Sequence, residues 1–373
     1  MKFLVCTHTE LLFLLLMKNL TTKIRIKDIA ELAGVSEGTV DRVIHQRGDV
    51  SEKSRLAVTK VLEEINYKPN ILARSLASKK QYTFVCLFPS YQPGEYWEKI
   101  EQGFLHAAQE FVHYNVLIQK FYFDQFDVNS FIEKYTEILA LQPDAVFLSP
   151  IFREEANKFT SFLNEREIPF SFIDSTIEEA NYLTYYGQNS FQSGYIAAKL
   201  LLSSVAENTK ILIIRTQRKG SVSNQTIARH KGFQHYLEES GLKDKYELVN
   251  VEFKDNDEEA NLALLRAVFD GCNNIKSAIT FNSKVYRLAM HLETLGQTNV
   301  TLIGYDLLDK NVSYLKQGVI SYLIAQRPDK QAYFTVRDMC RQLIFKQDIK
   351  RINYVPIDIL MKENIEDYLH FSE

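Results

Sequence analysis

The chain has 373 residues, of which 46% are hydrophobic and 24% charged, with 14 Gly and 8 Pro. This composition excludes a disordered or fibrous protein, and the length suits two or three globular domains. The net charge is −3, yet residues 18–80 carry 13 Lys and Arg against 8 Asp and Glu, whereas residues 81–373 carry 30 against 38. A basic head on an acidic body is the pattern expected when only the head contacts phosphate groups.

The first 23 residues contain an apolar run, Leu11–Met17, that is far too short to span a membrane. Only Lys2 precedes it as a positive flank and no small-residue cleavage site follows, which disfavours a secretion signal. We expect translation to start at Met17, so that residues 1–23 are a leader and not a folded domain. A peptide from residues 5–16 in the mass spectrum of the native protein would contradict this expectation.

Residues 24–69 predict three short helices around a small core. The first ends at Gly34-Val35, Ser36 is a suitable N-cap for the second at residues 37–44, and the third starts at Ser51. The third ends before Pro69, because the residue preceding a proline disfavours the helical region. Two short helices joined by a tight glycine turn form a helix-turn-helix, whose second helix fits the major groove of DNA. The core positions would be Ile26, Ile29, Ala30, Ala33, Val40, Val43, Ile44, Val58, Val61, Leu62 and Ile65.

This head resembles the lactose-repressor/galactose-repressor family of transcription factors. The residues that carry the resemblance are Ile26-Lys27-Asp28-Ile29-Ala30, Ala33-Gly34-Val35-Ser36, Thr39-Val40, Arg42-Val43, Val50-Ser51 and Tyr67-Lys68-Pro69-Asn70. Residues 70–77, Asn-Ile-Leu-Ala-Arg-Ser-Leu-Ala, resemble the hinge helix of that family. The resemblance therefore implies a DNA-binding domain at 24–69 and a hinge helix with linker at 70–80.

The resemblance also implies roles for single residues. Lys27, Ser36 and Thr39 would contact phosphates, while Glu37, Gly38 and Arg42 would face base edges, with Arg42 able to bind guanine in a bidentate manner. The hinge would fold only on the operator, and Leu76 from each subunit of a dimer would be wedged into a base step. The hinge residues expected at the DNA are Asn70, Ala73, Arg74 and Leu76.

Three positions depart from the family pattern. Arg25 replaces a capping Thr or Ser, which costs about 1 kcal/mol at the start of the first helix. Asp41 replaces a small Ser and would repel phosphate or accept a hydrogen bond from cytosine. Gly38 gives the recognition helix no side chain at a base-reading position. The operator sequence therefore does not transfer from familiar members.

From residue 81 onwards, short apolar runs alternate with amphipathic helices such as 195–205 and 262–269. This alternation predicts parallel, doubly wound sheets, and eleven strands exceed what one sheet usually holds, so we expect two sheets. Ligands of such folds bind outside the carboxyl ends of the strands. The predicted strands are Phe84–Phe88, Val116–Phe121, Ala145–Leu148, Phe170–Ile173, Leu183–Tyr186, Ile211–Ile214, Leu248–Val251, Ala278–Phe281, Leu302–Tyr305, Ile320–Ile324 and Tyr354–Leu360.

The sequence carries no phosphate-binding loop, dinucleotide fingerprint, nucleophile elbow or zinc-protease motif, and its 8 histidines are scattered. The four cysteines, Cys6, Cys86, Cys272 and Cys340, show neither metal spacing nor a pairing pattern, so we expect reduced thiols. We therefore predict no catalytic residues, no metal and no cofactor.

Residues 81–373 resemble the type I periplasmic binding-protein fold, especially the ribose-type sugar binders. The matching segments are Phe281-Asn282, Gly304-Tyr305-Asp306, Ile324-Ala325-Gln326-Arg327-Pro328 and Ala228-Arg229 with Lys231-Gly232-Phe233. The resemblance implies two lobes with a sugar between them, Tyr96 and the single Trp, Trp97, stacking on the ring, and polar groups on its hydroxyls. The polar residues are Asp174, Arg229, Asn282, Asp306 and Gln326. Tyr185-Tyr186-Gly187-Gln188-Asn189 departs from the family pattern and leaves the sugar open.

The sequence thus predicts a cytoplasmic transcriptional regulator, a repressor, that binds double-stranded operator DNA and a small effector, a sugar. No heptad pattern follows Leu360, so we expect a homodimer and no membrane association. Three alternatives remain open at this point: a purine or other non-sugar effector, an exported sugar receptor, and an enzyme on an α/β scaffold. Residues 24–77 argue against the second, and the missing nucleophile–base pair argues against the third.

Overall fold

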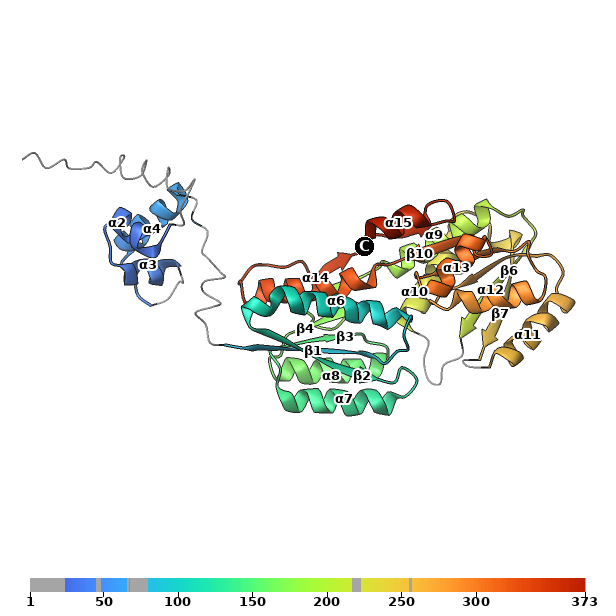
Figure 1. Cartoon of the computed structure of the whole chain (residues 1–373), viewed down its shortest axis with the longest axis horizontal. Helices are drawn as coiled ribbons and strands as arrows, with labels where there is room; N and C mark the ends of the chain where they lie inside the picture. The colour runs from blue at the N-terminus through green and yellow to red at the C-terminus, as the bar shows by residue number, and fades with distance from the viewer. Residues whose placement is uncertain are drawn as a thin grey trace, which may run out of the picture. The chain divides into compact units, whose positions relative to one another are not determined.

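The computed structural model describes residues 24–44, 48–65, 67, 80–216, 223–254 and 257–372. The chain divides into two compact units, Met1–Ala77 and Ser78–Glu373, which are drawn together in Figure 1. The predicted leader, residues 1–23, lies outside the described residues, and so do the hinge residues Asn70, Ala73, Arg74 and Leu76. Within the described ranges, no helix has the length and apolar character needed to cross a bilayer.

The first unit contains the three predicted helices, α2 (Ile26–Ala33), α3 (Glu37–Ile44) and α4 (Glu52–Glu64). Gly34 ends α2 in the left-handed region at φ 65°, which glycine adopts without the steric cost of a Cβ atom. The side chain of Ser51 caps α4 by accepting the backbone N–H of Ser54. The buried core is formed by Ile29, Ala30, Leu32, Val40, Val58, Val61 and Ile65.

The second unit contains two six-stranded sheets, which confirms the prediction of two sheets. The first sheet belongs to the N-terminal lobe and has the order β11-β5-β4-β3-β1-β2, with every pair of neighbours parallel. In this lobe α6 and α14 cover one face of the sheet, while α7 and α8 cover the other (Figure 1). Its elements are β1 (Tyr82–Pro89), α6 (Tyr96–Phe111), β2 (Val116–Phe123), α7 (Val128–Leu141), β3 (Ala145–Leu148), α8 (Arg153–Glu165), β4 (Phe170–Asp174), β5 (Thr184–Gly187), α14 (Pro328–Leu343) and β11 (Ile352–Tyr354).

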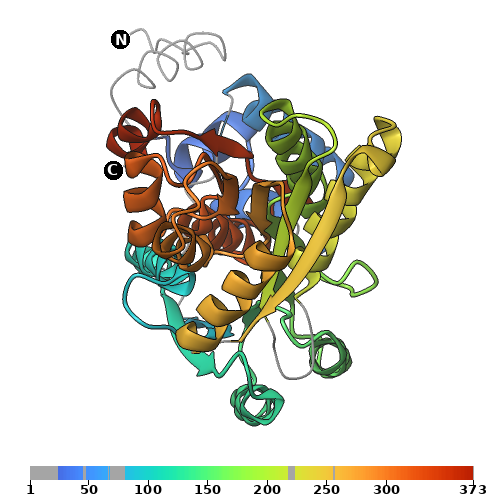
Figure 2. The same ribbon diagram turned by 90° about the vertical axis from the view of Figure 1, so that its right-hand side faces the viewer.

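The second sheet belongs to the C-terminal lobe and has the order β12-β10-β9-β8-β6-β7. Figure 2 shows helices on both sides of its strands. Along β6, Ile211 and Ile213 join one apolar cluster while Leu212 and Ile214 join the other, as expected for a parallel strand buried on both faces. The elements are α9 (Ser190–Ser203), β6 (Lys210–Thr216), α10 (Asn224–Glu239), β7 (Glu247–Phe253), α11 (Glu258–Gly271), β8 (Ile275–Thr280), α12 (Val285–Thr294), β9 (Thr301–Tyr305), α13 (Asp309–Gln317), β10 (Tyr322–Ala325), β12 (Asp358–Leu360) and α15 (Ile365–Ser372).

One predicted strand was wrong. The run Tyr354–Leu360 is not a single strand, because its two ends belong to β11 and β12 in different lobes. Pro356 lies between them and has no N–H to donate to a ladder, so the strand stops and the chain crosses over there. β12 pairs with β10 in the antiparallel direction, which makes this sheet mixed and not purely parallel as predicted.

The chain crosses between the lobes three times, after β5, after β10 and after β11. Val355 in the third crossing donates its backbone N–H to the carbonyl oxygen of Gly187 at the first, 2.9 Å away. Gln188 in the first crossing donates its side-chain amide to the carbonyl oxygen of Ala325 in the second, also 2.9 Å away. The three segments therefore support one another, and they place the carboxyl ends of both sheets on a common cleft.

Two glycines let α9 and α10 approach closely enough to place Arg229. A Cβ atom on Gly194 would lie 1.9 Å from the carbonyl oxygen of Arg229, and one on Gly232 would lie 1.9 Å from that of Phe191. Such contacts are far inside van der Waals distance, and they involve backbone atoms that cannot rotate away.

We expect Gly194→Ala to lower the free energy of unfolding by about 1–3 kcal/mol or more, because overpacking forces the two helices apart. Gly271→Ala is the matched control, since Gly271 lies in α11 with no atom within 4 Å of the added Cβ. Urea denaturation of both variants measures the difference, and equal stabilities would contradict the close-packing argument.

Candidate functional site

Six of the predicted DNA-contacting residues are described, and all lie on the first unit. Lys27 is on α2, Ser36 precedes α3, and the other four are on α3 itself. Only Thr39 is half-buried, while the rest are exposed. The Ser36 hydroxyl oxygen accepts the backbone N–H of Thr39 at 3.2 Å and lies 2.9 Å from the Thr39 hydroxyl. α3 therefore begins with a turn capped by Ser36 and carries Glu37, Gly38, Thr39 and Arg42.

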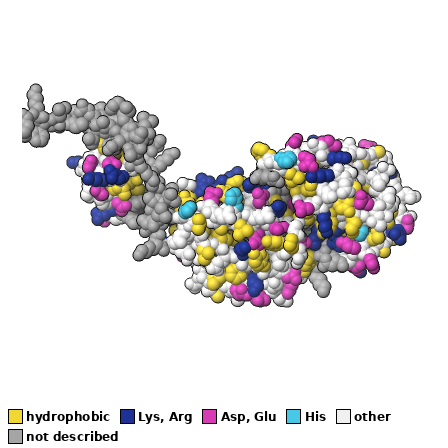
Figure 3. Space-filling model, viewed as in Figure 1, with side chains coloured by type: hydrophobic (Ala, Val, Ile, Leu, Met, Phe, Trp, Pro, Cys, Tyr) yellow, Lys and Arg dark blue, Asp and Glu magenta, His cyan; other side chains and the backbone are white. Residues whose placement is uncertain are grey.

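The exposed side of α3 carries both signs of charge, with Glu37 and Arg42 exposed and Asp41 half-buried. Basic and acidic side chains are likewise mixed on the visible face of this unit in Figure 3. A Cβ atom on Gly38 would contact nothing closer than the Ser36 hydroxyl at 3.9 Å, so the glycine leaves open space on the helix. At the start of α2, the backbone N–H of Arg25 donates to the Asp28 carboxylate at 2.9 Å, although the Arg25 side chain provides no cap.

A cavity of about 350 Å³ lies in the second unit at the carboxyl ends of both sheets. Its volume is within the range usual for small-molecule sites. All seven residues that the sequence singled out for ligand binding line it: Tyr96, Trp97, Asp174, Arg229, Asn282, Asp306 and Gln326. Tyr96, Trp97 and Asp174 come from the N-terminal lobe, and Arg229, Asn282 and Asp306 from the C-terminal lobe, so a ligand here would contact both lobes.

Each lobe contributes one buried carboxylate from an equivalent place. Asp174 ends β4 at φ 69° and Asp306 follows β9 at φ 71°, so both adopt the left-handed region that few residues other than glycine enter. Such conformations persist where surrounding structure holds them, and they concentrate at binding sites. Both side chains are largely removed from solvent, with exposed fractions of 7% for Asp174 and 5% for Asp306.

Arg229 is the buried positive charge of the cavity, with only 1% of it exposed, and Lys284 and Lys310 also line the cavity. Its guanidinium group donates to the carbonyl oxygen of Phe281 at 2.9 Å and to Oε1 of Gln326 at 3.3 Å. It also lies over the ring of Tyr305, 3.8 Å from the centroid, a cation–π contact strengthened by burial. Its Nε is buried and has no hydrogen-bond partner among the described residues.

The side chain of Gln326 connects Arg229 with Asp306. Its Nε2 donates to the Asp306 carboxylate at 2.8 Å, while its Oε1 accepts from Arg229. Burial raises the pKa of Asp306 from 3.8 to about 6, with Asp174 adding to the rise and Arg229 and Gln326 opposing it. The protein therefore keeps the Asp306 carboxyl group in the cavity although burial disfavours its charged form.

The aromatic pair and Asn282 complete the wall. Tyr96 and Trp97 open α6, both are buried, and their rings meet edge to face with centroids 5.1 Å apart. The Tyr96 hydroxyl is buried beside the Asp174 carboxylate. Asn282 donates its amide to the Thr216 hydroxyl at 2.9 Å and accepts the backbone N–H of Lys284 at 2.9 Å. Aromatic surface beside oriented polar groups suits the apolar face and the hydroxyls of a polyol ring.

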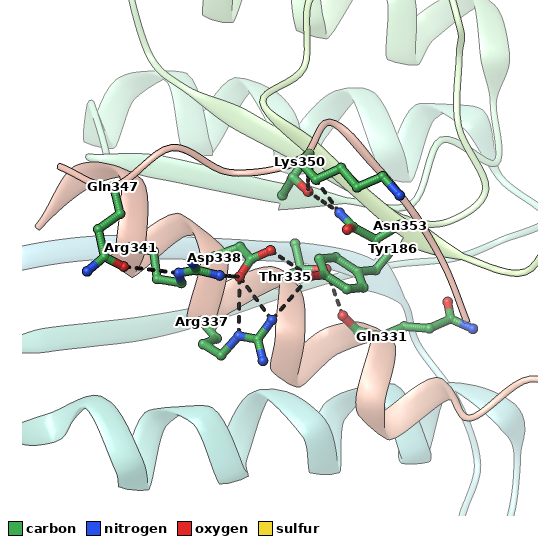
Figure 4. A network of polar contacts seen from close by, with 10 residues as sticks. Tyr186, Gln331, Thr335, Arg337, Asp338, Arg341, Gln347, Lys350 and Asn353 are labelled. Carbon is green, nitrogen blue, oxygen red and sulfur yellow. Dashed lines mark hydrogen bonds and ion pairs between the residues drawn. The ribbon is translucent and has the colours of Figure 1, made fainter. Parts of the chain in front are cut away.

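Helix α14 supports the cavity through Gln331. The backbone N–H of Asp174 donates to Oε1 of Gln331 at 3.1 Å, and Nε2 of Gln331 donates to the carbonyl oxygen of Gln326 at 2.7 Å. Further along α14, Asp338 accepts the Tyr186 hydroxyl at 2.5 Å and lies 3.1 Å from Arg337, as Figure 4 shows. These contacts tie α14 to β5 and fix the segment that carries Gln331.

Sequence reasoning missed several lining residues. Gln225 is the most informative, because it lies four residues before Arg229 on α10 and so projects from the same face of the helix. That spacing was the available clue. Glu95 and Lys284 face each other across the mouth at 3.8 Å. Thr216, Ser175, Ile151 and Leu308 also line the cavity.

Two family models match the chain. The model described as "Bacterial regulatory proteins, lacI family" covers residues 25–70. The model described as "Periplasmic binding protein domain" covers residues 85–347. Together they span both units and the cavity between the lobes.

Similar proteins carry regulator names. A solved structure of a putative LacI transcriptional regulator from Bacteroides fragilis is 37% identical, with a TM-score of 0.73, and covers 78% of this chain and 100% of that one. The ribose operon repressor of Lactococcus lactis is 24% identical over 75% of this chain and 80% of its own length. The regulator RegA of Clostridium saccharobutylicum is 25% identical over 61% of this chain and 65% of its own length, just under two thirds.

The exposed recognition helix, the two-lobed body with polar groups from both lobes at one cavity, and these matches agree. The chain belongs to the lacI family of bacterial regulatory proteins.

Proposed function

We propose that this protein is a transcriptional repressor that binds operator DNA through α3 and responds to a sugar bound in the cavity between its lobes. The observation that carries the proposal is the convergence of Asp174, Asp306, Arg229 and Gln326 from two lobes on one cavity. It lies in a chain whose first unit is a folded helix-turn-helix.

The DNA half of the proposal is supported by the exposure of α3. A helix that opens with a capped turn and presents an arginine to solvent has the form of a major-groove reader. Lys27, Ser36 and Thr39 would contact phosphates, while Glu37, Gly38 and Arg42 would face bases, as the sequence implies. In the hinge, Asn70, Ala73, Arg74 and Leu76 would contact the minor groove. An exported receptor would have no use for these residues, which is why we place the protein in the cytoplasm.

The sugar half is supported by the donors and acceptors of the cavity. Sugar hydroxyls both donate and accept, and here carboxylates face amide and guanidinium donors around an aromatic surface. The name of the ribose operon repressor, a relative, points the same way. The proposal assigns no catalytic role to any residue of the cavity.

The coupling between the two sites needs a second subunit. Closure of the lobes around a ligand would shift the N-terminal lobes of a homodimer against each other and misplace the two hinge segments. A ligand controls DNA binding only to the extent that it prefers one lobe arrangement over the other.

A thermal-shift screen tests the effector class. We expect a neutral monosaccharide to raise the melting temperature, because binding to the folded state alone stabilises it by about 2.7 kcal/mol at a hundred times the dissociation constant. Sugar acids, phosphosugars and purines form the other arms of the screen. A response to a purine with none to any sugar would overturn the sugar assignment and leave the DNA-binding role standing.

The raised pKa of Asp306 predicts how the stability of the protein changes with pH. Its folded pKa of about 6 lies above the ordinary 3.8, so the folded state binds the proton more tightly than the unfolded state. Its contribution to stability is thus fully present below pH 4 and is lost as the pH rises to 6, by about 1–3 kcal/mol.

The variant Asp306→Asn should remove this loss, so its stability relative to the wild type rises between pH 4 and pH 7, while sugar binding falls. Asp309→Asn is the control, because Asp309 lines the same cavity but is exposed. Urea denaturation across this pH range measures the effect. Parallel profiles for the wild type and Asp306→Asn would refute it.

We expect Arg42 to determine which base the protein prefers at one position of each operator half-site. We expect Arg42→Ala to cost about 1–3 kcal/mol at one base position in each half-site and to leave the other positions unchanged. The control is Arg55→Ala, which removes an exposed arginine from α4 and not from the recognition helix. Fluorescence anisotropy on an operator selected from random DNA, and on its single-base variants, would show the difference. An equal loss on every sequence would assign Arg42 to phosphate contact.

A further inference from the structure

Gln225 reaches from one lobe to the other inside the cavity. It lies in the first turn of α10 in the C-terminal lobe, and 9% of it is exposed. Its amide Nε2 donates to the backbone oxygen of Asp174 at 2.7 Å and to the Asp174 carboxylate at 2.9 Å. Asp174 belongs to β4 of the N-terminal lobe, so both hydrogen bonds join the lobes directly.

The same amide also meets Gln326, whose Oε1 lies 3.4 Å from Nε2 of Gln225. Because Gln326 donates in turn to Asp306, four side chains form one chain of contacts, Asp174–Gln225–Gln326–Asp306. This chain joins the carboxylate of one lobe to the carboxylate of the other. The Gln225 amide donates to Asp174 and to Oε1 of Gln326, and the Gln326 amide donates to Asp306, so the amide orientations are mutually consistent.

We propose that Gln225 is a positioning residue that holds the two lobes closed over the ligand site before a ligand binds. Separation of the lobes breaks two hydrogen bonds to Asp174, one of them to a buried carboxylate, and such charge-assisted bonds are among the stronger ones in proteins. If the cavity binds the effector as proposed above, Gln225 sets the fraction of the unliganded protein that has the closed, ligand-competent shape. This consequence rests on the proposed function.

Besides the contacts between the crossings, the described residues join the lobes through an ion pair and through apolar packing. The Lys284–Glu95 pair at the mouth spans 3.8 Å, with side chains 25% and 32% exposed, so solvent screens it. Leu308 of the C-terminal lobe packs into the apolar cluster of the N-terminal lobe. Neither contact orients a polar group toward a ligand, whereas Gln225 holds Asp174 in place while it joins the lobes.

The fraction of unliganded protein that is closed determines the apparent affinity for the ligand. A ligand that binds only the closed shape has an apparent dissociation constant equal to the intrinsic constant divided by the closed fraction. Loss of a charge-assisted hydrogen bond worth about 1.4 kcal/mol shifts the closed-to-open ratio about tenfold. We therefore expect Gln225→Met, which keeps the length of the side chain but removes its donor, to open the unliganded protein by about that factor.

The experiment measures the distance between the lobes by pulsed electron spin resonance on the full-length chain. Spin labels are placed through Asn157→Cys on α8 and Ala267→Cys on α11, both exposed positions on different lobes. The background removes Cys6 and Cys272 as serines, while Cys86 and Cys340 are fully buried and would not react. Gln234→Met is the matched control, since Gln234 is an exposed glutamine on the same helix.

Without ligand, Gln225→Met should populate longer distances than the wild type, and Gln234→Met should not. Gln225→Glu should open the lobes at least as far, because it places a second carboxylate against Asp174. Identical distance distributions for the wild type and Gln225→Met would overturn the proposal. Urea denaturation of each variant checks that it folds, and Gln225→Asn, whose side chain is too short to reach Asp174, replaces any variant that does not.

A second arm adds D-ribose, D-glucose or D-galactose to each protein. If a sugar closes the wild type and Gln225→Met alike while their unliganded distances agree, the sugar function stands and the role of Gln225 falls. If Gln225→Met is open without ligand but none of these sugars closes either protein, the role of Gln225 stands and the sugar assignment is contradicted. Closure of Gln225→Met by a sugar, with an apparent affinity weaker than that of the wild type by at most about tenfold, supports both.

Discussion

The burial of Arg229 is the constraint on which the cleft depends. A guanidinium group that is 1% exposed must find partners for its charge and donors, because an isolated buried charge costs far more than the fold can offset. Its partners come from three separate segments: Phe281 after β8, Gln326 after β10 and the ring of Tyr305 in β9. The same requirement explains the two interlocked glycines, since α10 can place Arg229 there only by pressing its backbone against α9.

The two carboxylates occupy equivalent places in the two lobes. Asp174 and Asp306 both leave a strand end in the left-handed region, yet Asp306 lies closer to Arg229 in the hydrogen-bond network and still has a raised pKa. Desolvation therefore outweighs the nearby positive charge. The Tyr96 hydroxyl is also buried, beside Asp174, and the Nε of Arg229 is buried without a hydrogen-bond partner among the described residues. Keeping these groups buried before a ligand binds lowers the stability of the fold and favours ligand binding.

The sequence predicted the parts of this architecture that local pattern determines. Parallel strands buried on both faces appear as apolar runs, so residues such as 145–148 were placed correctly, and Ser36 and Gly34 marked the turn before α3. The sequence-based predictions failed where contacts between distant parts of the chain determine the structure. Residues 354–360 look like one apolar strand, but whether a chain at Pro356 continues or crosses to another lobe depends on which sheet has a free edge. Gln225 is an ordinary helical glutamine until folding brings Asp174 within 2.9 Å.

The position of the linker determines which lobe can convey closure to the DNA-binding unit. Lys80, at the entrance to β1, is held to the N-terminal lobe, since its carbonyl oxygen accepts from Asn115 at 3.1 Å and its ammonium group lies 2.9 Å from Asp144. Along the chain, the C-terminal lobe is connected to the linker through the N-terminal lobe and the three crossings. Under the proposed function, a ligand that contacts Arg229 or Asp306 alone would act on the C-terminal lobe, whereas one that also contacts Asp174 would act on the lobe from which the linker emerges. Recognition from both lobes is thus a condition for control of DNA binding and not only a source of affinity.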